Sequence, residues 1–559
     1  MRIEVISVNS KSRTLIFWGA AFLLLAGAFF ALKPGALWIT DNGNKYIMMR
    51  NFANGGGLLI PHPVPELFPT GGFHFIPAER GAYSFYPEYL SFFTAPFYKL
   101  SGERGALFFP LAATLLLLFM AWRYWQLPPP VVLLSTPLFF YSLLLWEMTP
   151  SVFLATISLL LAERKKFTAA GAVLGVSLLM REEAYFLFAA MCGALLFTRN
   201  FRALLKFAAG FLCAALPIWI YQWSFHGHIL GTHGKNYYVN NNANFTIASQ
   251  FKAAFFNCFH HLFRFDGWER SGFNLLAWSA LLPLAAGAAP RFKAWKKLKY
   301  GASIIYLGAM LFLCTGLFFH KNTIYAGSML TGFLTAAPVL LGFTVNWHAF
   351  VRCRKFRIMA LAALLYMIAV PFLMTASDVG LVWGARHFLV LMPLLVYLSF
   401  CGFRLMGIPR FSFSSFSRKQ LIPSAALLLS VFIQLFGVFA LHRVSGESFR
   451  IEQKLLAAPE KIIVTDLFYL PEQMPRLFFE KTILQVISAG DLEILSKWLQ
   501  KQNEVNFIII LSPQFRRMND AVLKSLLERY PLTAPPEKMT GKGGFPDFFA
   551  GKCRVQNSR

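Results

Sequence analysis

Long apolar runs are the feature of this sequence that most restricts its fold. Stretches of roughly 15–22 mostly apolar residues recur from Thr14 to about residue 441, the length that an α-helix needs to cross a hydrocarbon core about 30 Å thick. Of the 559 residues, 56% are hydrophobic and 14% are charged, which is not the balance of an ordinary soluble domain. The sequence therefore predicts an α-helical polytopic membrane protein.

The apolar runs predict about 13 transmembrane helices. The first run has no small-residue cleavage site and leads into further spans, so we expect it to be a retained helix rather than a signal peptide. The expected spans are residues 14–32, 105–122, 131–146, 149–162, 168–180, 184–197, 204–222, 273–289, 300–319, 324–345, 358–376, 387–402 and 421–441.

The net charge of +27 is carried largely by basic clusters that lie between the apolar runs. Loops rich in Lys and Arg usually stay in the cytoplasm. All the basic clusters lie there if the N-terminus is cytoplasmic, so we expect that orientation. The loops 33–104, 223–272 and 377–386 and the tail after residue 441 then lie outside. Because the charges follow membrane topology, we expect no nucleic-acid partner. The basic clusters are residues 163–166, 198–206, 291–299, 351–357 and 418–420.

The tail after residue 441 has the character of a soluble domain. Runs rich in β-branched residues at 461–466, 481–488 and 506–513 alternate with helical patterns, which predicts a small parallel α/β unit. No G-x-G-x-x-G follows the first strand, so dinucleotide binding is not expected. We therefore expect a multi-span domain over residues 1–441, including the loop 33–104, and an extracytoplasmic α/β domain over 442–559 that caps the outer face or helps to recognise an acceptor.

The first outer loop, residues 33–104, is long for a connection between two spans, and long loops are usually functional. Asp41 is an isolated acid just past the first span, and either Asp41 or Asn42 can cap the turn that follows. An apolar side then alternates with a polar side, which predicts an amphipathic helix that lies flat in the membrane interface and ends at Gly55. The apolar side holds Tyr46, Ile47, Met49, Phe52 and Ala53, and the polar side Lys45, Arg50, Asn51 and Asn54.

Several motifs in this order resemble the GT-C superfamily of membrane glycosyltransferases, which includes protein O-mannosyltransferases and the aminoarabinose transferases that modify lipid A. Two positions depart from that group: relatives often have a second acid where Asn42 stands, and the Lys-Pro of the aminoarabinose transferases is Tyr86-Pro87 here. The identity of the sugar and the use of a metal are therefore left open. The matching segments are TDNGNKY (40–46), NFANGG (51–56), SFYPEY (84–89), APFYKLSG (95–102), GVSLLMREEAYFLF (175–188) and WGARHFLVLMPLLVYL (383–398).

The resemblance implies a transferase at the outer face of the bacterial inner membrane, acting in the cell envelope. It would move a sugar from a polyprenyl-phosphate-sugar donor to an acceptor hydroxyl on a lipid, a glycan or a protein, with inversion at the anomeric carbon. Such a reaction needs a carboxylate that accepts the proton of the acceptor hydroxyl, and Asp41 is our candidate for this general base. The alternative is that Asp41 only caps a helix.

Cations on the outer side are candidates for holding the donor phosphate. Arg386 could bind phosphate oxygens through two N–H groups, or could be an arginine anchored at the membrane interface. Arg181 lies beside two glutamates between short spans, and either lines the donor groove or forms a structural ion pair. Lys321 follows a span and is a further candidate, with a role as a positional anchor as the alternative.

Glu88 and Glu147 are secondary acidic candidates, for a divalent metal ion or for a substrate amine. The loop 223–272 holds His226, His228, His233 and His261 among Asn and Tyr residues, which suits contact with a glycan better than a zinc site. A flippase or transporter for polyprenyl-linked glycans and an O-antigen polymerase or ligase are the competing classes. Transporters usually show internal repeats, and none is visible in this sequence.

Overall fold

The computed structural model describes residues 11–33, 37, 39–69, 74–231, 278–288, 293–319, 332–373, 386–408, 420–502, 506–511, 517–539 and 548–554. The chain divides into two compact units. The first, here called the helical unit, comprises Met1–Ala31, Phe109–Leu143 and Glu147–Ala440. The second, here called the mixed unit, comprises Leu32–Phe108, Leu144–Trp146 and Leu441–Arg559.

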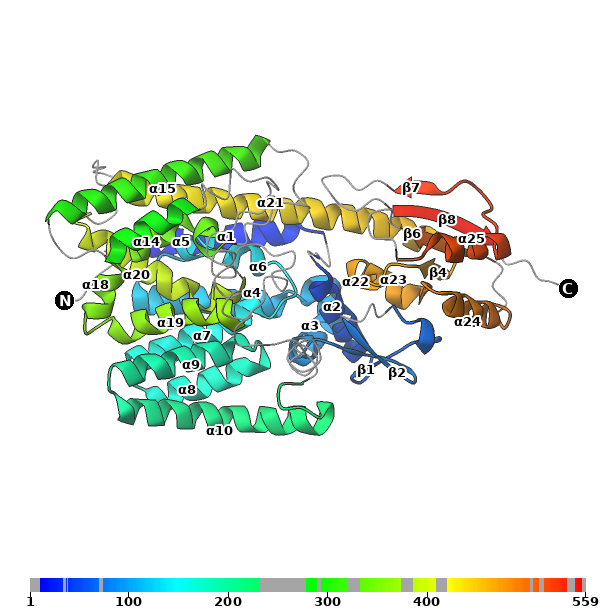
Figure 1. The fold of residues 1–559 in the computed structure, drawn as a ribbon, viewed down its shortest axis with the longest axis horizontal. Coiled ribbons are helices and arrows are strands. Elements are labelled where there is room, and N and C mark those ends of the chain that lie inside the picture. Colours follow the sequence, from blue (N-terminus) through cyan, green and yellow to red (C-terminus); the bar gives the residue numbers. More distant parts are fainter. Residues whose placement is uncertain are drawn as a thin grey trace. The chain divides into compact units, whose positions relative to one another are not determined.

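The described part of the helical unit consists of α-helices and short 3-10 turns (Figure 1). Its elements are α1 (Lys11–Ala31), α4 (Phe108–Trp125), α5 (Pro129–Leu134), α6 (Leu138–Tyr141), α7 (Met148–Glu163), α8 (Phe167–Val176), η2 (Ser177–Leu179), α9 (Glu183–Phe197), α10 (Phe201–His226), η4 (Trp278–Ala280), α14 (Leu281–Ala288), α15 (Lys293–Phe319), α16 (Phe333–Ala336), η5 (Pro338–Leu340), α17 (Leu341–Thr344), α18 (Trp347–Arg352), α19 (Arg357–Leu373), η7 (Arg386–Leu391), α20 (Met392–Leu405) and α21 (Leu421–Ala457), which continues into the mixed unit.

Six helical stretches among the described residues are long and apolar enough to cross a membrane. Four shorter apolar helices, of 10–17 residues, accompany them. The helical membrane class expected from the sequence is therefore confirmed, whereas the expected number of spans stays a prediction. The long stretches are Thr14–Ala31, Phe108–Trp125, Phe201–His226, Lys297–Thr315, Arg386–Leu405 and Leu421–Ala457.

Two of the expected spans are not continuous helices. Residues 131–146 hold α5 and α6, separated at Pro137, and residues 332–345 hold α16, η5 and α17, separated at Pro338. Proline has no N–H to donate and disfavours helical geometry at the residue before it. Ala337 accordingly has φ −139° and ψ 72°, outside the helical region. The chain is therefore helical at these two places, as expected, but each helix is interrupted next to a proline.

The broken segment 332–345 is buried inside the helical unit, where its backbone needs partners other than water. Side chains of the neighbouring helices provide them. The hydroxyl of Ser430 accepts the N–H of Val339 at 2.8 Å, and the amide of Gln434 donates to the carbonyl of Ala336 at 2.6 Å. Ser430 and Gln434 of α21 therefore stabilise an irregular backbone in the interior of the helical unit.

Helices α8 and α10 lie side by side in the helical unit (Figure 1) and approach each other through glycines. A Cβ atom on Gly171 would overlap the carbonyl oxygen of Phe207, and one on Gly210 would overlap that of Thr168. Small residues at such a crossing let two backbones pack directly against each other, which is a common source of helix association in membranes.

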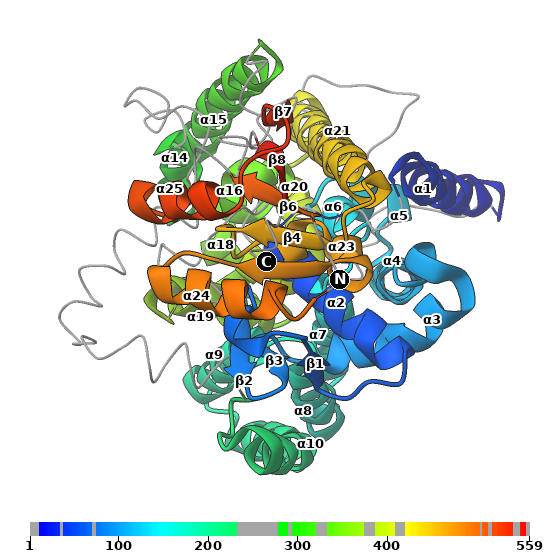
Figure 2. The ribbon, with the colours of Figure 1, turned by 90° about the vertical axis from the view of Figure 1, so that its right-hand side faces the viewer.

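The mixed unit contains two sheets and several short helices (Figure 2). The first outer loop forms α2 (Thr40–Ala53), β1 (Leu59–Pro61), η1 (Pro65–Leu67), β2 (Phe75–Ala78), β3 (Gly81–Ser84) and α3 (Tyr89–Gly105). The C-terminal segment forms β4 (Ile462–Thr465), α22 (Leu470–Gln473), α23 (Pro475–Glu480), β5 (Thr482–Gln485), α24 (Ala489–Leu499), β6 (Asn506–Leu511), α25 (Asp520–Arg529), β7 (Glu537–Met539) and β8 (Phe548–Arg554).

The C-terminal sheet has the strand order β5-β4-β6-β8-β7. Strand β4 pairs in parallel with β5 and β6, with Ile463 opposite both Ile483 and Ile508, and β8 is antiparallel to β6 and β7. The expected α/β unit is thus present, with a parallel centre and two antiparallel strands along one edge. Leu495 of α24 and Leu526 of α25 pack against one face of the sheet, together with Leu67 of η1.

The first outer loop is part of the same compact unit as the C-terminal segment, whereas the sequence analysis included it in the multi-span domain. Helix α2 packs so closely on α22 that a Cβ atom on Gly43 would overlap the backbone carbonyl of Glu472. Arg476 of α23 forms ion pairs with Glu103 of α3 and, at 3.6 Å, with Glu452 of α21. The loop and the tail therefore fold together around shared contacts.

Two residues of the expected polar side of α2, Lys45 and Asn51, are buried inside the unit, and its expected location in the membrane interface stays a prediction. Every residue from Asp41 to Met49 is buried, and Lys45 and Asn51 are only 2% and 5% exposed. Polar partners inside the unit explain this, because the amide of Asn51 donates to the carbonyls of Gly57 and Leu59 at 2.7 and 3.1 Å. The predicted end of the helix is confirmed, since α2 ends at Ala53 and Gly55 follows with φ 83°.

Candidate functional site

Asp41 lies in the first turn of α2, but it does not cap the helix. The residue before the helix is Ile39, whose N–H donates to the side-chain oxygen of Asn42 at 3.3 Å. The amide of Asn42 also donates to the carbonyl of Leu145 at 3.2 Å. Asn42 therefore satisfies the start of the helix, and the carboxylate of Asp41 is left for another interaction.

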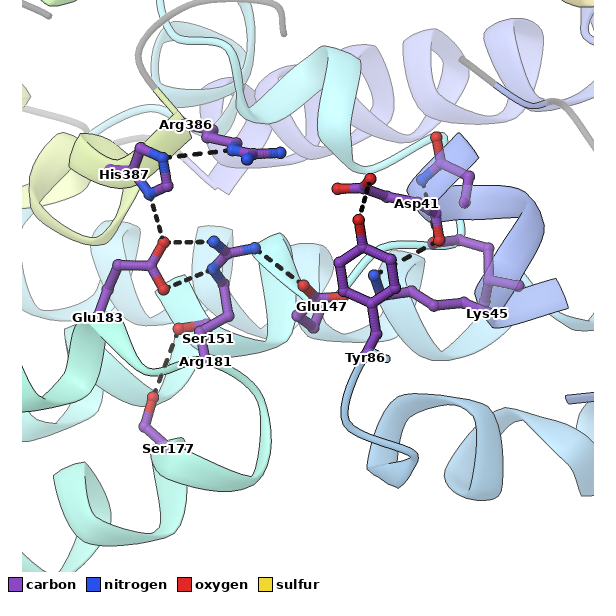
Figure 3. A network of polar contacts seen from close by, with 12 residues as sticks. Asp41, Lys45, Tyr86, Glu147, Ser151, Ser177, Arg181, Glu183, Arg386 and His387 are labelled. Atoms are coloured by element: carbon purple, nitrogen blue, oxygen red, sulfur yellow. Dashed lines mark hydrogen bonds and ion pairs between the residues drawn. The ribbon is translucent and has the colours of Figure 1, made fainter. Parts of the chain in front are cut away.

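That interaction is with Tyr86, whose hydroxyl donates to Oδ1 of Asp41 at 2.6 Å (Figure 3). Lys45 follows one helical turn after Asp41, with its Nζ 3.5 Å from the Asp41 carbonyl and 4.2 Å from the centroid of the Tyr86 ring. A buried cation and a buried carboxylate are costly to desolvate, and such groups are kept in proteins where they are paired or functional. Asp41, Lys45 and Tyr86 thus form a compact polar group at the start of α2.

A second pair in the mixed unit adjoins this group. Nδ1 of His74 lies 2.5 Å from Oε2 of Glu472, and the amide of Asn44 donates to Oε1 of the same carboxyl at 3.3 Å. The His74 ring is also 5.8 Å from the Tyr86 ring, centroid to centroid. Glu472 belongs to α22, so the C-terminal segment contributes directly to the surroundings of Asp41.

The ionisation of this pair follows from burial and charge. Burial alone would lower the pKa of His74, but the adjacent Glu472 carboxylate outweighs burial and raises it, with Asp41 acting in the same direction. Burial raises the pKa of Glu472, against the opposing influence of His74 and of the hydrogen bond from Asn44. Protonated His74 is therefore stabilised by carboxylates on two different segments of the chain.

The helical unit holds a separate polar cluster (Figure 3). The guanidinium of Arg181 donates to Glu147 at 2.9 Å and makes a two-point contact with Glu183, one arm of which measures 2.7 Å. His387 Nδ1 lies 2.7 Å from Glu183, and Nε of Arg386 donates to Nε2 of His387 at 3.4 Å. Because two carboxylates hold Arg181, the geometry favours the structural ion pair over the phosphate ligand among the two roles considered for it.

The other predicted site residues are distributed as follows. Arg386 is half-buried at the start of η7, and Glu147 is engaged by Arg181. Glu88 is buried at the N-cap of α3, where its carbonyl accepts the N–H of Phe92. Lys321 lies outside the described residues. Of the histidine-rich loop, His226 and His228 are described, and His233 and His261 lie outside.

Within the described ranges, no group of three or more His, Cys, Asp or Glu side chains is arranged to hold a metal ion. Glu88 and Glu147 belong to different units. The divalent metal ion considered from the sequence stays a prediction.

The sequence analysis did not single out Lys45, Tyr86, His74 or Glu472 as site residues. Lys45 carried a signal, because it stands four residues after Asp41 and so on the same side of the helix. Tyr86 lies in the motif SFYPEY (84–89), one of the segments that resemble the GT-C group. The contact of His74 with Glu472 joins residues 398 positions apart, and no local pattern could have predicted it.

These findings define an α-helical polytopic membrane protein with a small α/β unit and a buried carboxylate on the helix that follows its first apolar helix. Comparison with known proteins gives no matching family model and no similar curated protein. The similar solved structures include two of ArnT from Cupriavidus metallidurans, an aminoarabinose transferase of the GT-C group that the motifs resemble.

The structure of ArnT in the apo state has 14% sequence identity and a TM-score of 0.43, and the match covers 96% of this chain and 98% of that one. The structure of ArnT bound to undecaprenyl phosphate has 15% identity and a TM-score of 0.41, with 97% of this chain and 98% of that one covered. At these values the likeness is weak, and it assigns no role to any residue of this chain.

Proposed function

We propose that this protein is a membrane glycosyltransferase of the bacterial inner membrane. It transfers a sugar from a polyprenyl-phosphate-linked donor to an acceptor hydroxyl at the outer face, with the N-terminus in the cytoplasm and the C-terminal segment in the periplasm. The observation that carries the proposal is the buried carboxylate of Asp41, held by Tyr86 and one turn from Lys45, on the helix directly after the first apolar helix.

In the proposed reaction, Asp41 is the general base. The acceptor hydroxyl gives its proton to the carboxylate as its oxygen bonds to the anomeric carbon of the donor sugar. The bond from that carbon to the polyprenyl phosphate breaks, and the electron pair leaves on the phosphate oxygen. A single displacement of this kind inverts the anomeric configuration. The hydrogen bond from Tyr86 fixes the orientation of the carboxylate, which a general base requires.

The departing phosphate gains negative charge and needs a cation. Lys45 is our candidate in the mixed unit, because its ammonium group is buried beside Asp41 and a point charge of this kind suits a phosphate. Arg386 remains the candidate in the helical unit, where its planar guanidinium could bind two phosphate oxygens. Arg181 and Lys321 are not part of the proposal, and neither is a divalent metal.

The test compares cell-envelope glycolipids, glycans and glycoproteins by mass spectrometry in a deletion strain that carries the wild-type or a variant gene. Wild type should restore a sugar modification that the deletion removes. Asp41→Asn keeps the size of the side chain but removes the base, so the amount of modified product should fall roughly 10²- to 10⁴-fold. Asp520→Asn is the matched control, because Asp520 also lies in the first turn of a helix, α25.

Equal amounts of folded protein in all strains, measured by size-exclusion chromatography of a tagged chain, are required for the comparison. The Asp520→Asn strain should match the wild type. A wild-type product level in the Asp41→Asn strain would show that Asp41 is not the general base. A deletion strain whose envelope is unchanged in all three fractions would contradict the transferase function itself.

A further inference from the structure

Asn44 stands three residues after Asp41 in α2, so the two side chains lie on the same side of the helix. The Asn44 side chain is fully buried, and its amide group contacts three different parts of the mixed unit. The amide nitrogen donates to the backbone carbonyl of His74 at 2.7 Å and to Oε1 of Glu472 at 3.3 Å, and the amide oxygen accepts the hydroxyl of Ser84 at 2.5 Å. Asn44 therefore joins the C-terminal segment to the end of strand β3.

The direction of each of these hydrogen bonds follows from the chemistry of the partners. A carboxylate and a backbone carbonyl can only accept hydrogen bonds, so the amide nitrogen of Asn44 must face them. The amide oxygen then faces Ser84, whose hydroxyl donates to it, and the hydroxyl oxygen accepts the N–H of Tyr86 at 3.1 Å. The carboxylate of Glu472 thus begins a series of hydrogen bonds through Asn44 and Ser84, here called the relay, that ends at the backbone of Tyr86.

Tyr86 connects the relay to Asp41. Its hydroxyl donates to Oδ1 of Asp41 at 2.6 Å (Figure 3), and the direction of this bond depends on where the Tyr86 backbone lies. Two hydrogen bonds fix that backbone: the N–H of Tyr86 donates to Ser84, and the N–H of Phe85 donates to the carbonyl of His74 at 2.9 Å. Both acceptors belong to residues that also contact the Asn44 amide, so the relay fixes the position from which the tyrosine hydroxyl donates.

We propose that Glu472 is a positioning residue for the proposed reaction, and that it acts through the relay on Tyr86. The tyrosine in turn fixes the orientation in which the Asp41 carboxylate accepts the proton of the acceptor hydroxyl. This inference rests on the proposed function. A general base must lie within hydrogen-bond distance of the proton that it accepts, so a small misplacement lowers the rate. The C-terminal segment therefore takes part in the reaction through a side chain that does not itself reach the reacting atoms.

The alternative is that Glu472 only ties the C-terminal segment to α2. A second carboxylate provides the matched control for this alternative. Glu480, at the end of α23, pairs at 2.6 Å with Arg50 in the last turn of α2. This pair joins the same two segments of the chain, but at the opposite end of α2 from Asp41. A general tie between the segments would be weakened by Glu480→Ala as well, whereas the relay would stay intact.

The experiment measures the envelope product by mass spectrometry in the deletion strain, at equal amounts of folded full-length protein. Glu472→Ala and Ser84→Ala each interrupt the relay at one place. Glu472→Gln can preserve it, because the new amide oxygen can accept from Asn44 and the new amide nitrogen can donate to a neutral His74 ring. Ser84→Ala is also combined with Tyr86→Phe, which removes the hydroxyl through which the relay acts.

We expect Ser84→Ala to lower the product about 3- to 10-fold, the worth of one hydrogen bond, and Glu472→Ala to lower it about 10-fold. Glu472→Gln should retain more product than Glu472→Ala, and Glu480→Ala should match the wild type. Because the relay acts through Tyr86, Ser84→Ala should lower the product no further when Tyr86→Phe is already present, since effects that share one step are not additive.

Wild-type product in Glu472→Ala or Ser84→Ala would overturn the relay. So would an equal loss in Glu480→Ala or Glu472→Gln, or a full additional loss in the double variant. If Glu472→Ala gives too little folded protein, Ser84→Ala decides the question, alone and together with Tyr86→Phe. These results are distinct from failure of the proposed function, in which Asp41→Asn would keep its product.

Discussion

At the residue scale, Tyr86 makes a direct hydrogen bond to the carboxylate of Asp41. Its hydroxyl is 2.6 Å from the carboxylate, and its ring lies beside the ammonium group of Lys45. One tyrosine thus contacts both the proposed base and the proposed phosphate ligand.

Tyr86→Phe separates these two contributions, because it removes the hydroxyl and keeps the ring. We expect transfer to fall by about 10- to 100-fold, since a hydrogen bond to a charged group is lost and the carboxylate is no longer held in place. Thermal stability should change little. The measurement is product level at equal folded protein, with Tyr83→Phe as control, because Tyr83 is 40% exposed on the adjacent strand β3. Full activity in Tyr86→Phe would show that Asp41 does not need the hydrogen bond from Tyr86.

At the scale of elements, the contact between α2 and α22 holds the site together. Gly43 allows the two backbones to touch, and the residues that flank it, Asn42 and Asn44, make hydrogen bonds to Leu145 and Glu472. The glycine is costly in a helix, by about 1 kcal/mol relative to alanine. Its presence here is explained by the close approach, since any side chain would push α22 away.

Gly43→Ala should therefore destabilise the mixed unit although alanine favours helix. We expect the free energy of unfolding to fall by about 1–3 kcal/mol, which is typical of overpacking. Sugar transfer should fall as well, because the contact of Glu472 with His74 depends on the position of α22. The measurement is thermal unfolding of the purified chain in detergent. Gly19→Ala in α1 is the control, because a Cβ atom there would meet no other atom within 4 Å and the change should be neutral or stabilising. A neutral Gly43→Ala would mean that the two helices are not in backbone contact.

The elements also show what could be predicted from the sequence. Apolar runs, β-branched runs and Gly55 are local signals, and they correctly predicted the membrane class, the α/β tail and the end of α2. The sides of α2 could not be predicted, because a helix pattern reports burial only when the opposite side faces water. Here the polar side of α2 meets partners such as Glu472, 428 positions away from Asn44. Pro137 and Pro338 can disrupt a helix, and both can be read from the sequence. The prediction gave more weight to the apolar residues around them.

At the scale of the whole molecule, the placement of the loops across the membrane is the most general prediction. Basic clusters between apolar runs favour a cytoplasmic location, and the first loop and the tail should lie together on the opposite side. Reporter fusions at residues 164 and 295 should give a cytoplasmic signal, and fusions at residue 60 and after residue 450 a periplasmic one. Because the first loop and the tail form one compact unit, opposite locations for these two would contradict both the topology and the fold.

The distance along the chain between α2 and α22 also has a consequence for biosynthesis. Asn44 and Glu472 are 428 positions apart, and a ribosome adds about 5–20 residues per second, so roughly 20–90 s pass between their synthesis. During that interval α2 has been made but lacks the surface on which Gly43 packs. The surroundings of Asp41 are therefore completed only near the end of translation, and an unfinished chain in the membrane has no complete site.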